Sequence, residues 1–511
     1  MGVSRLTLAL TASLALLGCA SDARDVGVTT AALRPDDPDA GDQSEAFEPG
    51  VELETLDGDQ GAVRVHFTRE GQHAVPALVP DYAQEVADEY EAALAFYRDE
   101  LGFLPPLADD FVTGGNGGDA RLDVYLIDFA TSADGAFRID ACLADEPQRC
   151  AGHMIHENDF DGRSYSSLSV ANRTIASHEL FHAIQHAYNA NTGIVLGEGS
   201  AVWASETYAP ELLDFELLIA GYFDRPERSL GQEPTGPVDA FSYGTAIFFR
   251  FLEERFSREV QRELWEALRA DEQADASSWL GALDGVLIDE HDSSLADAFA
   301  DFVRWNLYTG TRTNAAEAYA EGARYPQLVE REVELPFNDD RVRVFPLSAR
   351  YYVAELTDDA DVVVEVTENE ASIAGLRLLL ALEAEGEITE VATHEVEAGT
   401  ENRLLLHGAR GERVHAALLS TQRQGESLQP ALCFGRAGDD TPCRPAEQPD
   451  ADVDAGSVDD AGGDPSPASS SGGGCSSALP AKRPAGGGLA SALFALGLVW
   501  LRLVIVASRS R

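Results

Sequence analysis

Two histidines and a glutamate share one short, otherwise mostly apolar segment of this chain. His178, Glu179 and His182 form the pattern His-Glu-x-x-His. Residues four apart on a helix lie one turn apart on nearly the same face, so both imidazoles can bind one metal ion. Zn²⁺ accepts two such nitrogen ligands, and Glu179 would then stand beside it as a general base for water. The pattern predicts a zinc-dependent hydrolytic centre on a helix.

The chain after His182 indicates which class of zinc site this is. Gln185 and Tyr188 stand where metzincin proteases have Gly and His, so that class is excluded. The segment Gly-Glu198-Gly-Ser-Ala resembles the Glu-Gly-x-Ala segment of gluzincin metalloproteases. That resemblance implies that Glu198 is the third zinc ligand.

Two further residues stay open as alternatives at this site. Glu206 lies eight residues after Glu198 and is either a ligand or a carboxylate that orients a ligand histidine. His186 lies one turn beyond His182 and ranks behind both glutamates, because its position around the helix is further from His178.

A hydrolytic centre also needs a donor for the oxyanion that forms during peptide hydrolysis. The segment Phe-Ser-Tyr243-Gly-Thr-Ala resembles the Tyr-x-x-Gly/Ala helix start of aminopeptidase-N-like gluzincins, which implies this role for Tyr243. The run His156-Glu157-Asn158 does not match the Gly-x-Met-Glu-Asn order by which those aminopeptidases hold a substrate amine. We therefore expect an endopeptidase.

The resemblance to gluzincins covers about residues 60–325 and implies a fold as well as an activity. It implies a thermolysin/aminopeptidase-like catalytic domain, with an edge sheet beside a helical lobe, that hydrolyses a protein or peptide substrate. Two rival hypotheses stay open. In the first, the chain is a catalytically inert surface adhesin or binding protein on a metalloprotease-like fold. In the second, it is a zinc hydrolase of a non-peptide substrate.

Hydrophobic periodicity predicts the elements that position these residues. Alternating apolar residues predict one or two strands over 51–67, and an amphipathic helix is expected over 79–101. Residues 174–307 have a helical pattern, and short alternating runs over 342–433 predict an antiparallel β-sandwich-like domain. The predicted class is α+β. The predicted divisions are a signal peptide (1–19), a flexible acidic linker (20–48), the metalloprotease catalytic domain (49–335), a β-sandwich-like accessory domain (336–445), an acidic low-complexity linker (446–474) and a C-terminal sorting or anchor tail (475–511).

Both ends of the chain resemble bacterial export signals. Arg5, an apolar run and Gly-Cys19 resemble a lipoprotein signal peptide, in which Cys19 would be lipidated. A Gly-Cys475 motif, an apolar stretch at 489–507 and terminal arginines resemble MYXO-CTERM sorting tails. We expect an exported protein, held at the cell surface or outer membrane by the lipid, the tail or both.

Charge and cysteine content agree with that compartment. The chain has 37 Lys+Arg against 88 Asp+Glu, a net charge of −51, which argues against nucleic acid as a partner. Short spacings favour disulfides Cys142–Cys150 and Cys433–Cys443, although other connectivities of these four cysteines remain open.

Overall fold

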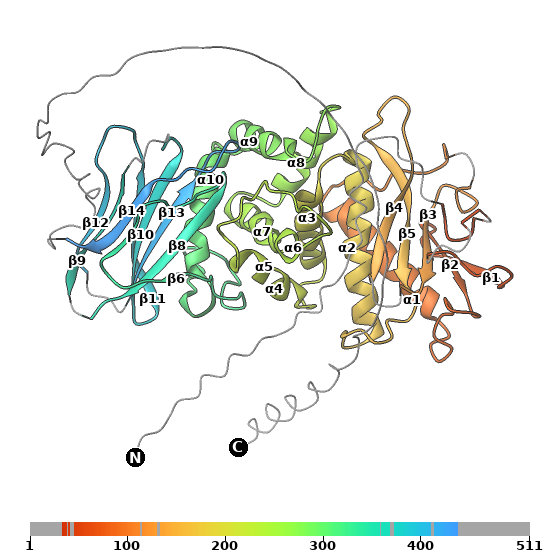
Figure 1. The fold of residues 1–511 in the computed structure, drawn as a ribbon. Coiled ribbons are helices and arrows are strands. Elements are labelled where there is room, and N and C mark those ends of the chain that lie inside the picture. The colour runs from red at the N-terminus through yellow and green to blue at the C-terminus, as the bar shows by residue number, and fades with distance from the viewer. Residues whose placement is uncertain are drawn as a thin grey trace, which may run out of the picture. The chain divides into compact units, whose positions relative to one another are not determined.

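The computed structural model describes residues 33–437, with gaps at 38, 41–44, 113–114, 130–132, 358, 368–372 and 410–412. Within this range helices and sheets both contribute large parts of the fold, which confirms the predicted α+β class (Figure 1). The signal peptide, the second acidic linker and the C-terminal tail, with Cys19, Cys443 and Cys475, lie outside the described residues. No helix among the described residues is both long and apolar enough to cross a membrane.

The first sheet has five strands in the order β1-β2-β3-β5-β4. The inner pairs β2/β3 and β3/β5 are parallel, whereas β1 and β4 pair antiparallel to their neighbours at the two edges. All eight residues of β5 are buried, as expected for a strand covered on both faces. The strands are β1 (Leu53–Asp57), β2 (Val63–Thr68), β3 (Leu122–Ile127), β4 (Gly135–Cys142) and β5 (Cys150–Glu157).

Helices α1 (Tyr82–Ala95) and α2 (Leu168–Tyr188) cover one face of this sheet (Figure 1). Apolar side chains from β2, β3 and β5 join both helices in one core cluster. The helical region continues through α10, as the sequence pattern predicts. Its further helices are α3 (Ile194–Tyr208), α4 (Asp214–Leu218), α5 (Ala220–Phe223), α6 (Ala240–Gly244), α7 (Ala246–Arg255), α8 (Glu259–Arg269), α9 (Ser278–Glu290) and α10 (Leu295–Trp305).

The opposite face of the first sheet is covered by the chain that precedes β1. Phe47 packs against Tyr125, Ile127 and Ile155 of the sheet. Arg34 is buried and makes ion pairs with aspartates from distant parts of the sequence. The sequence predicted a flexible linker over 20–48, but the described part of 33–48 is docked on the sheet, because its few apolar and basic side chains find buried partners there.

The C-terminal region contains two sheets that pack face to face. Their strand orders are β11-β10-β13-β8-β6 and β12-β9-β14-β7. Leucines and valines that alternate along the strands form the core between them. The strands are β6 (Arg331–Glu332), β7 (Phe337–Asp339), β8 (Ser348–Glu355), β9 (Ala360–Thr367), β10 (Leu376–Ala384), β11 (Glu387–Glu395), β12 (Asn402–Ala409), β13 (Arg413–Ser420) and β14 (Ala431–Arg436).

The outward face of the β8-β10-β13 sheet continues the core of the helical region. Ala349, Tyr351 and Leu379 belong to the same apolar cluster as the helices, and the Tyr351 hydroxyl donates to the carbonyl of Val303 at 3.0 Å. The sheet that contains β8, β10 and β13 therefore packs on the helical region with one face and on the second sheet with the other.

Candidate metal centre

Helix α2 carries the His-Glu-x-x-His pattern through the interior of the protein. It begins at Ser167, whose hydroxyl accepts from the amide of Val170 at 3.2 Å, a typical N-cap. Its central residues are buried on every side, because α2 lies between the first sheet and α3. A buried helix cannot solvate the polar side chains of this pattern, so the protein must supply partners for them.

A short connection brings α3 back against α2 and places Glu198 in its second turn. The amides of Ile194 and Val195 at the start of α3 donate to the carboxylate of Glu233, at 2.7 Å for the shorter bond, which fixes this helix end. Glu198 thereby faces the two histidines of α2. The sequence separation between His182 and Glu198 is short because the connection between α2 and α3 is short.

His178, His182 and Glu198 form a compact group of potential metal ligands. One ligand atom from each lies within 4.8 Å of the others. Nε2 of His178 is 3.2 Å and Nε2 of His182 is 3.6 Å from the same Glu198 oxygen, Oε2. All three side chains are buried. The structure thus brings together the two predicted histidines and the carboxylate that the gluzincin resemblance implied.

Two buried polar atoms of this group lack a hydrogen-bond partner among the described residues. They are Nε2 of His182 and Oε1 of Glu198. Buried polar atoms are rarely left unpaired, because desolvation without a partner is costly. A cation bound by these side chains would satisfy both atoms, and two imidazoles with one carboxylate match the ligand preference of Zn²⁺.

Gln185 determines which nitrogen of His182 faces the group. Its Oε1 can only accept, so the 2.9 Å contact with His182 Nδ1 is donated by the imidazole. In the neutral imidazole that metal binding requires, the lone pair of His182 is therefore on Nε2, the atom beside Glu198. The Gln185 amide nitrogen donates in turn to the carbonyl of Gly197 at 2.8 Å and to the hydroxyl of Ser200 at 3.1 Å. Gln185 couples a ligand on α2 to the backbone next to the ligand on α3.

The electrostatics of this group favour a positive charge. Burial disfavours the protonated form of His182, but the Glu198 carboxylate outweighs burial and raises the pKa of His182 to about 9. Burial likewise disfavours the Glu198 carboxylate, yet His182 and His178 lower the pKa of Glu198 to about 2. Without a metal, a proton on His182 supplies the positive charge that balances the Glu198 carboxylate. A bound divalent cation would supply it in the same place.

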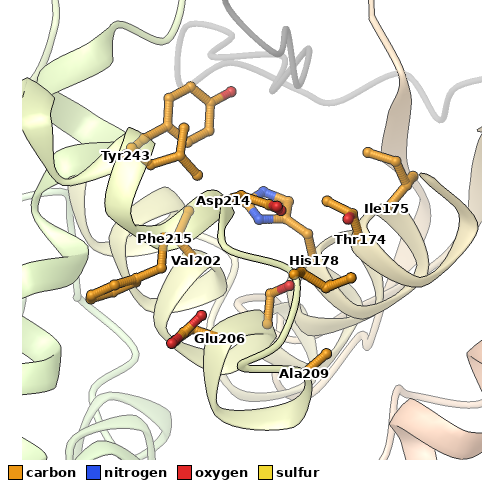
Figure 2. Close-up of a pocket in the computed structure, with 12 residues that line it drawn as sticks. Thr174, Ile175, His178, Val202, Glu206, Ala209, Asp214, Phe215 and Tyr243 are labelled. Carbon is orange, nitrogen blue, oxygen red and sulfur yellow. The ribbon is translucent and has the colours of Figure 1, made fainter. Parts of the chain in front are cut away.

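Glu179 and Tyr243 lie at the borders of this centre. Glu179 is buried beside the start of β4, where a Cβ on Gly135 would be 2.8 Å from Glu179 Cγ. The ring centroids of Tyr243 and His178 are 6.2 Å apart. In Figure 2, Tyr243 lies on one wall of a pocket and Ile175 on the other, with His178 between them.

Neither alternative ligand belongs to the compact group. His186 donates from Nδ1 to the carbonyl of His182 at 2.8 Å, packs on Phe137, and has a pKa lowered to about 4 by burial. Glu206 lines the pocket beside His178 instead, among apolar residues of α3 and α4. Burial raises the pKa of Glu206 to about 8.

The segment after Met154 has structural partners. His156, at the end of β5, contacts the Asn172 amide oxygen at 3.2 Å, and Glu157 accepts from the amide of Phe129 at 3.0 Å. These residues tie β5 to α2 and to the chain after β3.

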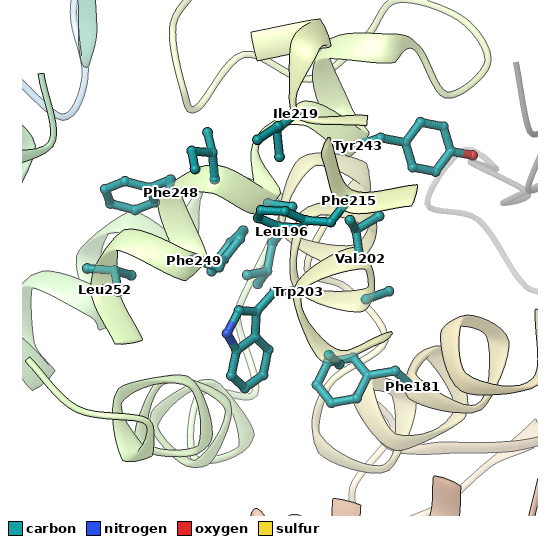
Figure 3. Close-up of a cluster of buried hydrophobic side chains, with 14 of the residues drawn as sticks. Phe181, Leu196, Val202, Trp203, Phe215, Ile219, Tyr243, Phe248, Phe249 and Leu252 are labelled. Carbon is teal, nitrogen blue, oxygen red and sulfur yellow. The ribbon is translucent and has the colours of Figure 1, made fainter. Parts of the chain in front are cut away.

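An apolar cluster supports the centre from behind (Figure 3). Phe181 of α2, Trp203 of α3 and Phe249 of α7 are among its buried members. Trp203 donates from its indole to Glu253 at 2.8 Å. The cluster fixes α2 and α3 against each other, and therefore fixes the distance between their ligands.

The disulfide Cys142–Cys150 is present and links the ends of β4 and β5, as predicted. Cys433 is also disulfide-bonded, and its predicted partner Cys443 lies outside the described residues.

Sequence reasoning missed three residues of the site, Gln185, Ser200 and Gly135. Gln185 is three residues after His182 on the same helix, a spacing at which side chains meet, so this partner was accessible to the sequence. Ser200 and Gly135 depend on how separate elements pack, which no local pattern reports.

Comparisons with known proteins do not assign a family. No family model matches the chain, and no curated protein matches it. One similar solved structure is the pre-peptidase C-terminal domain of a collagenase from Bacillus anthracis, with 8% identity over 21% of this chain and 94% of that chain, at a TM-score of 0.17. Another is a family GH115 4-O-methyl-alpha-glucuronidase, with 9% identity over 52% of this chain and 38% of that chain, at a TM-score of 0.13. At these TM-scores neither match carries an argument about this chain.

Proposed function

We propose that this protein is a zinc-dependent endopeptidase of gluzincin type, with His178, His182 and Glu198 as zinc ligands. The observation that carries the proposal is the buried ligand group in which His182 Nε2 and Glu198 Oε1 have no other partner among the described residues. The fold supports it, since an antiparallel edge strand, β4, lies beside the helix that carries the pattern, and helices form the other side.

The proposed roles follow from where the side chains lie. When bound, Zn²⁺ lowers the pKa of water and polarises a carbonyl group. Glu179, next in sequence to a ligand and buried against β4, would accept a proton from the attacking water and deliver it to the leaving amine. Tyr243, across the pocket from Ile175, would donate a hydrogen bond from its hydroxyl group to the oxyanion.

The proposed compartment is extracytoplasmic. The Cys142–Cys150 disulfide supports it, because such bonds persist in oxidising environments. Lipidation at Cys19, sorting through Cys475 and attachment to a membrane belong to the same proposal and rest on the sequence alone.

The proposal is tested with the purified full chain. Wild-type protein should bind one equivalent of zinc and hydrolyse casein or a peptide library, and a chelator should stop hydrolysis. Glu179→Gln should retain zinc while hydrolysis falls by at least about a thousandfold, because the base is lost and the ligands remain. Absence of stoichiometric zinc would favour the inert adhesin. Zinc without peptide hydrolysis would favour a hydrolase of another amide or ester.

A further inference from the structure

The pocket beside His178 has features that the zinc group does not use. Its walls come from α2, α3, α4 and α6, and most of them are apolar, including Ile175, Val202, Phe215 and Leu218. It also contains two carboxyl groups, those of Glu206 and Asp214. Figure 2 shows Val202 and Phe215 between the Tyr243 side of the pocket and Glu206.

The acidic groups in this pocket have no cationic partner among the described residues. Two arginines lie near enough to influence Glu206, but each is engaged elsewhere. Arg250 pairs with Glu253 at 2.6 Å and stacks over Phe215, and Arg324 pairs with Glu216. Because both arginines are paired elsewhere, burial dominates and raises the pKa of both Glu206 and Asp214. The pocket therefore holds two carboxyl groups whose ionised forms a bound cation would favour.

We propose that this pocket binds a basic side chain of the substrate, next to the bond that is cleaved, with Glu206 as the residue that selects it. This inference rests on the proposed endopeptidase function. The methylene groups of an arginine or lysine match the apolar walls, since these side chains bury their stems while the charged end reaches a polar group. The guanidinium or ammonium then meets Glu206 beyond Val202 and Phe215.

The state of Glu206 agrees with such a guest. Burial raises its pKa to about 8 and outweighs the opposing effect of Arg250 and Arg324, so the carboxylate is disfavoured while no cationic guest is bound. A bound cation would favour the carboxylate and lower this pKa. An apolar guest would gain nothing from Glu206 and would leave its carboxyl group without a partner in the pocket.

The test uses zinc-loaded full-length protein and three peptides that differ only at one residue next to the scissile bond. Cleavage mapping of a peptide library first identifies which side of the bond the pocket serves. That position then carries arginine, norleucine or glutamate. We expect kcat/KM to be about tenfold higher for arginine than for norleucine, the effect of one partly buried ion pair, and lowest for glutamate.

Glu206→Gln should lower the arginine-to-norleucine ratio by about tenfold, because it removes the charge and keeps the shape. The matched control is Glu272→Gln, an exposed glutamate outside the pocket, which should keep the wild-type ratio. Two results would overturn the inference: a wild-type preference for norleucine over arginine, or an unchanged ratio in Glu206→Gln. Either of these results leaves the proposed function unaffected. Failure of the zinc-bound protein to cleave any peptide would overturn both the proposed function and this inference.

Discussion

At the scale of single residues, the hydrogen bond between Gln185 and His182 decides which imidazole nitrogen is available for a metal. A neutral imidazole has one donor and one acceptor nitrogen, and the Gln185 oxygen fixes Nδ1 as the donor. Because the Gln185 amide also binds the Gly197 carbonyl, the same side chain holds the turn of α3 that presents Glu198. Gln185 therefore contributes to metal affinity without being a ligand.

We predict that Gln185→Leu weakens zinc binding by about tenfold to a hundredfold, the usual cost of losing a partner that orients a ligand. The affinity is measured by competition with a chromogenic chelator. Gln185→Glu retains an acceptor for His182 Nδ1 and serves as the control, with a smaller loss. Unchanged affinity in Gln185→Leu would show that His182 needs no such support.

Removal of the metal should lower the stability of the whole chain. Without a cation, Nε2 of His182 and Oε1 of Glu198 have no hydrogen-bond partner among the described residues, so a bound metal ion would add contacts that only the folded state offers. At zinc a thousandfold above its dissociation constant, binding adds about 4 kcal/mol to the free energy of unfolding. We expect a chelator to lower the unfolding midpoint of the wild-type protein, as measured by calorimetry. The variant Glu198→Ala should show a much smaller response to chelator.

At the scale of elements, the ligands are placed by close approaches that only glycine permits. A Cβ on Gly135 would be 2.5 Å from Ile175 Cγ2, so β4 and α2 could not keep their spacing. A Cβ on Gly199 would be 2.2 Å from Thr245 Oγ1, at the junction of α6 and α7. The glycine that follows Glu198 is therefore needed for packing, whatever its value as part of a motif.

We predict that Gly135→Ala lowers kcat/KM by about tenfold or more, because α2 must shift and carry Glu179 with it, and small displacements of reacting groups are costly. The unfolding midpoint should fall as well. Gly285→Ala is the control, since Gly285 lies in α9 with open space around its Cβ position. That change should stabilise the protein by about 0.5–1 kcal/mol and leave kcat/KM unaltered.

The elements also show what the sequence could and could not predict. Strands over 360–367 and 376–384 match the expected runs, because the short apolar stretches between turn residues are local information. The docking of the described residues between 33 and 48 was not predictable in this way. Arg34 pairs with Asp109, Asp123 and Asp140, and each of these contacts joins residues 75 or more positions apart.

The residues of the candidate site also fall into those that the sequence predicts locally and those that it does not. His178, Glu179 and His182 lie within one helix, so their mutual placement follows from helix geometry alone. Glu198 needed a resemblance to known proteases, because its approach to the histidines depends on the connection between α2 and α3. The pocket that contains Glu206 combines four helices, and no periodicity in the chain indicates it.

At the scale of the whole described chain, a buried ionic cluster joins the end of the helical region to the β-sheet that follows it. Arg312 pairs with Glu330 at 2.6 Å. His415 of β13 contacts Glu330 at 2.8 Å and Glu383 of β10 at 2.9 Å. With His415 protonated, two positive and two negative groups balance in a dry environment, as buried charges require.

This balance makes stability depend on pH. Burial opposes protonation of His415, but its hydrogen bonds to Glu330 and Glu383 raise its pKa above the ordinary 6.5. Its contribution is therefore complete below pH 6.5 and is lost as the pH rises through the raised pKa. Burial also opposes the Glu330 carboxylate, but His415 and Arg312 lower its pKa below 4.5. That contribution is present above pH 4.5 and is lost as the pH falls through the lowered pKa.

We therefore predict that the cluster stabilises the protein most between about pH 4.5 and 6.5, the interval in which both contributions are complete. The difference in unfolding midpoint between wild type and His415→Asn should be largest there and should shrink as the pH rises through the raised pKa of His415. Calorimetry of both proteins across pH 4–9 measures this difference. His407→Asn is the control, because His407 pairs with Asp361 on the surface and its side chain is 76% exposed. A difference for His415→Asn that stays constant above pH 6.5 would mean that packing, and not charge, accounts for what this histidine contributes to the junction.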